Sequence, residues 1–327
     1  MGYRIQSRQA DSVTDRDAGV YHLLGPDGDE AEIWPALGFN VFRWRPVRNH
    51  VASECLYADP ELFTGGRPTR SGIPVLFPFP NRIREGHFVW AGQTYSLIPN
   101  DPAMRNAIHG FACRTAWRIV NCGSDADSAW ITGVFRGSID GGWTPEQWPA
   151  DHEIELTVRL SRGTLRLEAV IRNPDSVPLP FGLGYHPYFR ADDATQVQVP
   201  ANRFWCLSEN IPSGETREVD SARDLNHLRK LGDLKLDDIL TALPSPSARP
   251  DGLIERAIVR GPLTVRLACS PVFREMVVFT PPHRQAFCIE PYTCTTDAVN
   301  LDARGMDAGW LTLPPGGEWI AVVEFSV

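Results

Sequence analysis

The chain has 327 residues, with 32 lysines and arginines against 40 acidic residues and a formal net charge of −8. No basic patch stands out along the sequence, so nucleic acid and anionic membrane surfaces are not expected as partners. No segment approaches the roughly 18 uninterrupted apolar residues of a membrane-spanning helix, and the first residues lack the apolar core of a signal peptide.

The predicted elements are short strands, because 28 prolines and 27 glycines interrupt the chain and long helical periodicity is absent. Residues 154–160 and 165–171 alternate apolar and polar side chains, and residues 161–164 between them predict a β-hairpin. One short helix is predicted around residues 220–230. Further strands are predicted, in chain order, at residues 117–120, 130–135, 263–267, 276–280 and 319–325.

Many short strands separated by turn residues favour the all-β class. Residues 242–250 are rich in proline and serine, but similar strand patterns resume after them, so we interpret this segment as an exposed loop and not as a domain boundary. The sequence therefore predicts one domain over residues 1–327, a large and mainly antiparallel β-sandwich with few short helices.

Two segments with a proline–tyrosine step carry candidate acid–base residues. In residues 181–190, Pro187 restricts the backbone of His186 to an extended conformation, and aromatic residues surround it. A histidine held in this way suits a general acid, although a lone histidine of this kind is more often a hydrogen-bonded core residue. Residues 287–293 place Glu290 in a similar apolar frame, and this second segment favours the catalytic interpretation of both.

Three further segments carry polar residues that suit a binding site. Arg82 ends the proline-rich segment 72–83 and presents either a planar fork for hydroxyls or a structural brace for an acid, two interpretations of equal weight. His109 on its own is interpreted as a structural histidine. Asp237 and Asp238 are adjacent, so in a strand only one of them can face a pocket.

Other common chemistries lack a sequence signal. The glycine-rich motifs of nucleotide-binding proteins and the Gly-x-Ser-x-Gly motif of serine hydrolases are absent. The seven cysteines are scattered without a Cys-x-x-Cys pair, which favours a reducing, cytoplasmic setting over a disulfide framework or a structural zinc site. We therefore expect neither a cofactor nor a metal ion.

Taken in order, the motifs resemble those of the aldose 1-epimerase (galactose mutarotase) family. The motifs Tyr-His-Pro-Tyr-Phe and Glu-Pro-Tyr-Thr are specific, whereas His-Gly and Asp-Asp gain weight from their order. The resemblance implies a galactose mutarotase-like supersandwich with a sugar site on an open concave face and no cofactor. The segments that carry it are residues 72–83, 108–110, 184–189, 236–238 and 289–293.

Carried over residue by residue, the resemblance assigns Glu290 as the catalytic base and His186 as the catalytic acid. It assigns His109, Arg82 and Asp237 to substrate binding, with Asp238 as the alternative to its neighbour. The implied function is that of an isomerase that interconverts the α and β anomers of a free hexose by opening and closing the sugar ring. The expected partner is a small sugar, and the expected state is a monomer or a homodimer.

The ordinary pKa values of glutamate and histidine, about 4.3 and 6.5, already allow one group to be ionised as base while the other is protonated as acid. We expect a carboxylate near His186 to raise the pKa of that histidine. Two alternative functions remain open. One is a hexose-6-phosphate 1-epimerase, for which Arg84, Arg105 and Arg114 are available to bind phosphate, and the other is a sugar-binding protein without catalysis.

Overall fold

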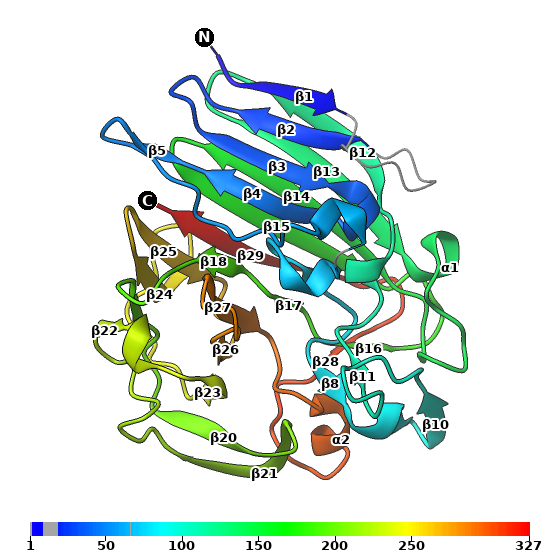
Figure 1. Cartoon of the computed structure of the whole chain (residues 1–327). Helices are drawn as coiled ribbons and strands as arrows, with labels where there is room; N and C mark the ends of the chain where they lie inside the picture. Colours follow the sequence, from blue (N-terminus) through cyan, green and yellow to red (C-terminus); the bar gives the residue numbers. More distant parts are fainter. Residues whose placement is uncertain (1, 9–18, 66) are drawn as a thin grey trace.

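The computed structural model describes residues 2–8, 19–65 and 67–327 and is built almost entirely from antiparallel sheets (Figure 1). The longest sheet has nine strands in a curved layer. In spatial order they are β12 (Arg118–Ser124), β13 (Ala129–Arg136), β14 (Glu153–Ser161), β15 (Thr164–Arg172), β29 (Glu318–Ser326), β25 (Thr264–Cys269), β24 (Ile254–Arg260), β19 (Gln196–Gln198) and β22 (Arg229–Lys230).

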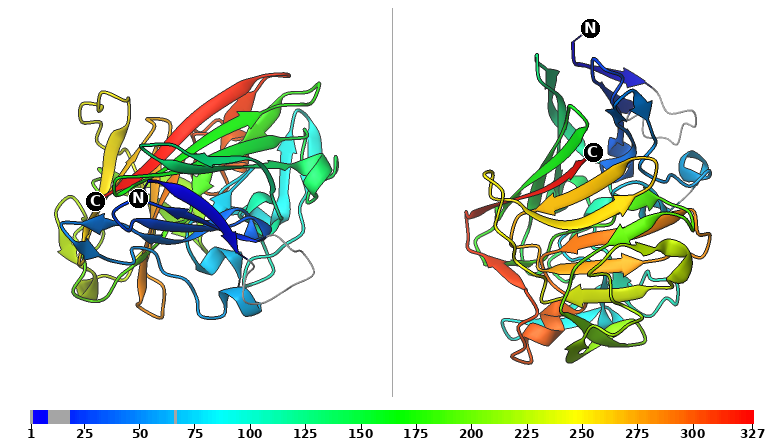
Figure 2. Two further views of the ribbon diagram at one scale, coloured as in Figure 1. Left: turned by 90° about the horizontal axis from the view of Figure 1, so that it is seen from above. Right: turned by 90° about the vertical axis from the view of Figure 1, so that its left-hand side faces the viewer.

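A four-stranded sheet packs over one end of this layer, as both views in Figure 2 show. Apolar side chains from both sheets belong to one buried core cluster. Along β14, alternate residues point into this core and are fully buried, which is the period-two pattern expected of a strand with one apolar face. The four strands are β1 (Arg4–Arg8), β2 (Val20–Leu24), β3 (Glu30–Trp34) and β4 (Asn40–Arg45).

The third large sheet has eight strands and lies in the other half of the molecule (Figure 1). In spatial order they are β21 (Ile211–Glu218), β20 (Arg203–Ser208), β23 (Asp237–Thr241), β26 (Glu275–Phe279), β27 (Ala286–Tyr292), β17 (Gly184–Tyr185) and β7 (Val75–Leu76), with β18 (Tyr188–Arg190) also paired to β27.

Short pairs of strands and single helical turns complete the secondary structure of the described residues. The strand pairs are β5 (Val47–Arg48) with β6 (Val51–Ala52), β8 (Arg82–Ile83) with β11 (Ala107–Ile108), β9 (His87–Trp90) with β10 (Gln93–Ser96), and β16 (Leu179–Phe181) with β28 (Leu311–Leu313). The helical turns are α1 (Gly137–Asp140), α2 (Ala298–Asp302), η1 (Pro35–Leu37), η2 (Leu62–Thr64), η3 (Pro68–Arg70), η4 (Arg84–Gly86), η5 (Ala112–Arg114) and η6 (Leu231–Asp233).

The all-β class and the antiparallel sheets with few short helices are confirmed. The predicted hairpin is formed by β14 and β15, which pair along their full length up to Ser161 and Thr164. The five other predicted strands correspond to β12, β13, β25, β26 and β29. In the part of the chain that the structure describes, no helix is long and apolar enough to cross a membrane.

The helix predicted around residues 220–230 is wrong. The carboxylate of Asp220 accepts hydrogen bonds from the backbone N–H groups of Ala222 and Arg223, and that of Asp224 accepts one from Asn226. Aspartate side chains that bond to the backbone two or three residues ahead favour turns over a continuing helix. The segment is therefore a series of turns that ends in β22.

The pairing of β17 with its two neighbours brings distant segments of the chain together. Gly184 lies opposite Tyr292 of β27 on one side and opposite Leu76 of β7 on the other. A Cβ atom on Gly184 would lie 2.5 Å from Cδ1 of Tyr292 and 2.7 Å from Cβ of Pro80, closer than real contacts allow. The absence of a side chain at this position therefore permits the close approach of the three segments.

Gly184→Ala should lower the free energy of unfolding by about 1–3 kcal/mol, because the added methyl group overpacks the contact with Tyr292 and Pro80. Urea denaturation of the purified variant measures this change. Gly261→Ala is the matched control, since a Cβ atom there meets no atom within 4 Å. Equal stability of the two variants would contradict the packing argument.

Candidate active site

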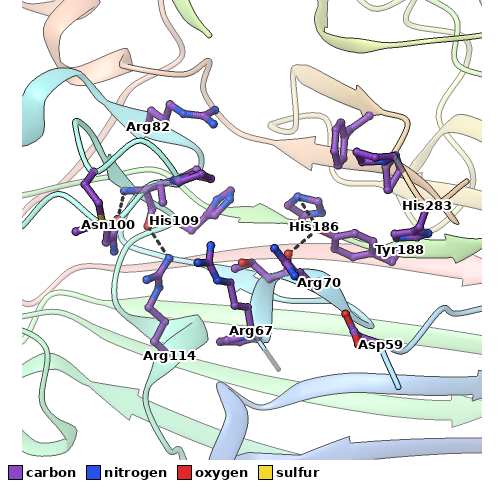
Figure 3. A pocket seen from close by; sticks show the side chains of 18 residues that line it. Asp59, Arg67, Arg70, Arg82, Asn100, His109, Arg114, His186, Tyr188 and His283 are labelled. Carbon is purple, nitrogen blue, oxygen red and sulfur yellow. Dashed lines mark hydrogen bonds between the residues drawn. The ribbon is translucent and has the colours of Figure 1, made fainter. Parts of the chain in front are cut away.

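A pocket of about 790 Å³ lies where η3, β8, η5 and β18 approach one another (Figure 3). Its volume is within the range of small-molecule binding sites. Arg82, His109 and His186 line it, so three of the five predicted site residues share one cavity. Glu290 contacts His186, and Asp237 lies close enough for its charge to act on Glu290.

His186 and Glu290 are in direct contact, with 3.3 Å between Nε2 of the histidine and Oε1 of the glutamate. His186 follows the last residue of β17, and its backbone N–H donates a hydrogen bond to the carbonyl of Pro74. Glu290 lies within β27, the strand that pairs with β17. The contact is therefore a consequence of strand pairing, and both side chains are more than nine-tenths buried.

Two tyrosines hold this pair in place. The ring of Tyr188 stacks on the His186 ring with 4.6 Å between centroids and an angle of 3° between planes. The Tyr188 hydroxyl donates a hydrogen bond of 2.6 Å to the carbonyl of Thr69 in η3. On the other side, the Tyr292 hydroxyl donates a hydrogen bond to Oε2 of Glu290. Tyr292 lies two residues after Glu290, so both side chains leave the same face of β27.

Burial dominates the protonation of the pair. It raises the pKa of Glu290 well above the ordinary value and lowers the pKa of His186 to about 3. The expectation that a nearby carboxylate raises the pKa of His186 is therefore wrong, because burial disfavours both charges and keeps the carboxyl group itself neutral. Two groups in contact titrate as one system, and because burial disfavours the charge on each, it favours the neutral pair with its single proton on Glu290.

His109 faces His186 across the pocket, with 5.6 Å between ring centroids and an angle of 73° between planes. Its backbone has a φ of 67°, and its N–H group donates a hydrogen bond to the carbonyl of Asn81. Burial is the main cause that lowers its pKa, followed by the charges of His186, Arg114 and Arg82. His109 is therefore a neutral group, suited to exchanging hydrogen bonds with a ligand and not to carrying a positive charge.

Arg82 is braced by an acid and also lines the pocket. Its Nε lies 3.6 Å from a carboxylate oxygen of Asp101, and its Nη1 donates a hydrogen bond to the side chain of Asn81. Its side chain also lines the pocket and is 17% exposed. An arginine braced on one side in this way presents its remaining donors in a fixed direction.

The two adjacent aspartates point to different surroundings. Asp238 accepts a hydrogen bond of 2.6 Å from Nε of Arg223, so its carboxylate is already engaged in an ion pair. Asp237 is open to solvent, yet surrounding protein atoms partly desolvate its carboxylate and raise its pKa, an effect that the charge of Arg82 opposes. Its charge also acts on Glu290, so Asp237 is the member of the pair next to the site.

Several residues of the site were missed by sequence reasoning. Tyr292 could have been found from its spacing of two residues from Glu290 along a strand. Arg67 precedes η3 and Arg70 is its last residue. Neither belongs to a sequence motif, and both line the pocket together with Arg114 (Figure 3). The other two arginines considered for phosphate binding are outside this lining, since Arg84 lies 3.7 Å from Asp297 and Arg105 lies 3.4 Å from Glu209.

One group of side chains has the composition of a metal site. Within the described residues, ligand atoms of His186, Cys288 and Glu290 lie within 4.8 Å of one another, and all three residues are buried. Burial raises the pKa of the Cys288 thiol and of the Glu290 carboxyl well above their ordinary values, so both groups retain their protons. Metal ions bind the deprotonated forms, so a cation at this group would have to displace both protons.

Comparison with known proteins identifies the family of the chain. The family model described as aldose 1-epimerase matches residues 37–326, so the chain belongs to the aldose 1-epimerase family. Among curated proteins, it is 27% identical to the uncharacterized protein YihR of Escherichia coli strain K12 over 235 residues, 69% of this chain and 71% of that protein. It is 29% identical to YphB of the same strain, also uncharacterized, over 46% of this chain and 48% of that protein.

Solved structures show the same fold. A galactose mutarotase-like protein from Clostridium acetobutylicum aligns with a TM-score of 0.82 and 23% identity, covering 99% of this chain and 98% of that one. Galactose 1-epimerase from Lactobacillus acidophilus aligns with a TM-score of 0.78 and 14% identity, with coverage of 99% and 98%. A putative aldose 1-epimerase from Escherichia coli K12 aligns with a TM-score of 0.72 and 19% identity, covering 99% of both chains.

The raised pKa of Glu290 predicts a pH-dependent stability. The Glu290 carboxyl of the folded protein keeps a proton that the same group in the unfolded chain releases above about pH 4.5. The contribution of this proton to stability is therefore complete below that pH and is lost as the pH rises toward the pKa of Glu290 in the folded protein. Glu290→Gln carries no titrating group. Its free energy of unfolding should therefore fall less than that of the wild type between about pH 6 and about pH 8.

Urea denaturation at both pH values measures this difference. Glu215→Gln is the matched control, because that glutamate side chain is 73% exposed and its removal should leave the pH dependence of the wild type in place. Parallel pH curves for the wild type and Glu290→Gln would show that the carboxyl group is ionised in the folded protein.

Proposed function

We propose that the protein is an aldose 1-epimerase that interconverts the α and β anomers of a hexose. The observation that carries the proposal is the 3.3 Å contact between His186 and Glu290 beside the pocket. Anomer exchange moves protons on two oxygens bonded to the same carbon, the anomeric hydroxyl and the ring oxygen. The two catalytic groups must therefore lie close together and differ in protonation.

In the proposed reaction, the Glu290 carboxylate accepts the proton of the anomeric hydroxyl while protonated His186 donates a proton to the ring oxygen. The bond between carbon 1 and the ring oxygen breaks, and the carbonyl group of the open sugar forms. Rotation about the bond between carbons 1 and 2 then presents the other face of the carbonyl. Ring closure with the two roles reversed returns both protons, so the pair begins and ends with a single proton.

The working form has its proton on His186, whereas burial in the empty pocket favours a proton on Glu290. The Tyr292 hydroxyl and the charge of Arg82 both lower the pKa of Glu290 against the effect of burial. Hydroxyl groups of a bound sugar add further dipoles next to the pair. Proton transfer across the existing contact then gives the carboxylate base and the imidazolium acid together, without a proton from solvent.

The other predicted residues suit recognition of a sugar with several hydroxyl groups. Arg82 supplies donors only, Asp237 supplies acceptors while it is ionised, and neutral His109 supplies one donor and one acceptor. Such a mixture matches hydroxyl groups, which donate and accept at once. We assign these three residues to binding and orientation of the substrate.

A sugar-binding protein without catalysis is the less favoured alternative. Burial of an acid and a base in contact destabilises the folded state by disfavouring the ionised form of each group. Binding of a sugar requires hydrogen-bond partners and apolar contacts, and it does not require such a pair. Destabilised groups of this kind concentrate at catalytic sites.

Glu290→Gln and His186→Asn should each lower kcat by about 100-fold or more, because each variant removes one of the two proton-transfer groups. Polarimetry on freshly dissolved α-glucose or α-galactose, corrected for the uncatalysed rate, measures the loss.

Glu275→Gln serves as the control, since Glu275 is a fully buried glutamate on the neighbouring strand β26 and lies outside the pocket lining. It should retain activity. Wild-type kcat in either Glu290→Gln or His186→Asn would refute the assigned roles.

A further inference from the structure

The pocket is strongly basic although the protein is acidic. Arg67, Arg70, Arg82 and Arg114 line it, and Asp59 is the one carboxylate in its lining, whereas the whole chain has a formal net charge of −8. Arg82 is paired with an acid, as described above. In the described part of the chain, the other three arginines have no carboxylate within ion-pair distance. Such a concentration of unpaired positive charge in a concave site attracts anions.

Arg67, Arg70 and Arg114 lie on one wall of the pocket, and Arg82 lies on the opposite wall (Figure 3). This basic wall, as we call Arg67, Arg70 and Arg114, comes from two short helical turns, η3 and η5, that pack against each other. The three arginines therefore face the pocket from the same side.

The basic wall is held in a fixed position beside the catalytic pair. The side-chain amide of Asn40 donates hydrogen bonds of 3.3 and 2.9 Å to the carbonyls of Pro68 and Ser71, at either end of η3. The Tyr188 hydroxyl bonds to Thr69 in the middle of η3, and the Tyr188 ring stacks on His186. Arg70 thus extends from a backbone segment that is tied to the proposed acid.

We propose that the pocket binds a hexose with an anionic group at carbon 6, such as a phosphate ester or a carboxylate, and that Arg70 and Arg114 bind this group. The inference rests on the proposed function, in which His186 protonates the ring oxygen. Carbon 6 is attached to carbon 5, which is bonded to that same oxygen, so a substituent on carbon 6 lies on the His186 side of the sugar. The charge of Arg70 acts on Tyr188 and on His283, which places its guanidinium group in this part of the pocket.

The chemistry of arginine favours an anion over a neutral hydroxyl at this position. A guanidinium group presents paired donors that match two oxygens of a phosphate or a carboxylate, and such charge-assisted bonds are about twice as strong as neutral ones. The sequence alone offered a phosphosugar only as an alternative, because it could not place the arginines. The basic wall makes an anionic hexose the favoured substrate class.

Exchange spectroscopy by NMR on equilibrated anomers measures kcat/KM for glucose, glucose 6-phosphate and glucuronate under the same conditions. At low ionic strength, the wild type should favour one of the two anionic sugars over glucose by tenfold or more, and added salt should reduce this preference. Arg70→Ala and Arg114→Ala should each lower kcat/KM for the favoured anionic sugar by about 10- to 100-fold, a larger loss than for glucose. A preference for glucose 6-phosphate identifies phosphate as the group, and a preference for glucuronate identifies carboxylate.

Arg48→Ala is the matched control, because Arg48 is an exposed arginine of β5 outside the pocket, and it should behave as the wild type. Equal kcat/KM for glucose and both anionic sugars, or equal losses for all sugars in Arg70→Ala and Arg114→Ala, would overturn the proposal.

Calorimetric binding of glucose 6-phosphate and glucuronate to Glu290→Gln separates this inference from the proposed function. If the wild type exchanges no sugar but Glu290→Gln binds an anionic sugar in a manner that Arg70→Ala abolishes, the catalytic proposal fails and the anion site stands. If neither anionic sugar binds, the anion site fails whatever the activity on glucose.

Discussion

The contact between His186 and Glu290 depends on the pairing of strands that are distant in the sequence. Gly184 brings β17 against Tyr292 of β27, and this register carries His186 and Glu290 to the same point at the pocket. The stacked ring of Tyr188 and the hydroxyl of Tyr292 then fix the two groups, whose side chains are both more than nine-tenths buried. Rigid strands hold a reactive geometry more accurately than loops do, and here both groups are anchored to one sheet.

Burial gives this contact its chemical character. An exposed glutamate and histidine near neutral pH would hold their charges independently, whereas this pair is driven toward a neutral state with one proton. That proton is the one that an anomer exchange needs to move between two oxygens of the same carbon. The same burial destabilises the folded protein, so the proposed activity and the stability of the chain are in opposition at this site.

The sequence predicted those features that a local pattern of residues determines. The alternation in residues 154–171 predicted the strands β14 and β15 and the hairpin that they form. Sequence reasoning failed where the outcome depends on the surroundings. Burial among side chains from several strands sets the direction of the His186 pKa shift. The arginines at η3 belong to no sequence motif, and only the folded structure shows that they line the pocket. The predicted helix around Asp220 failed because its carboxylate accepts hydrogen bonds from the backbone N–H groups of Ala222 and Arg223, which favours turns.

The measurement that tests the central claim most directly is an NMR titration of the His186 ring nitrogens in ¹⁵N-histidine-labelled protein with an empty pocket, with His186→Asn used to assign the signal. Because burial lowers its pKa to about 3, the His186 ring should remain neutral from about pH 5 to about pH 8. A His186 ring that gains a proton near or above pH 6.5 would show that the pair is an ordinary ion pair, and it would contradict the account of one proton confined by burial.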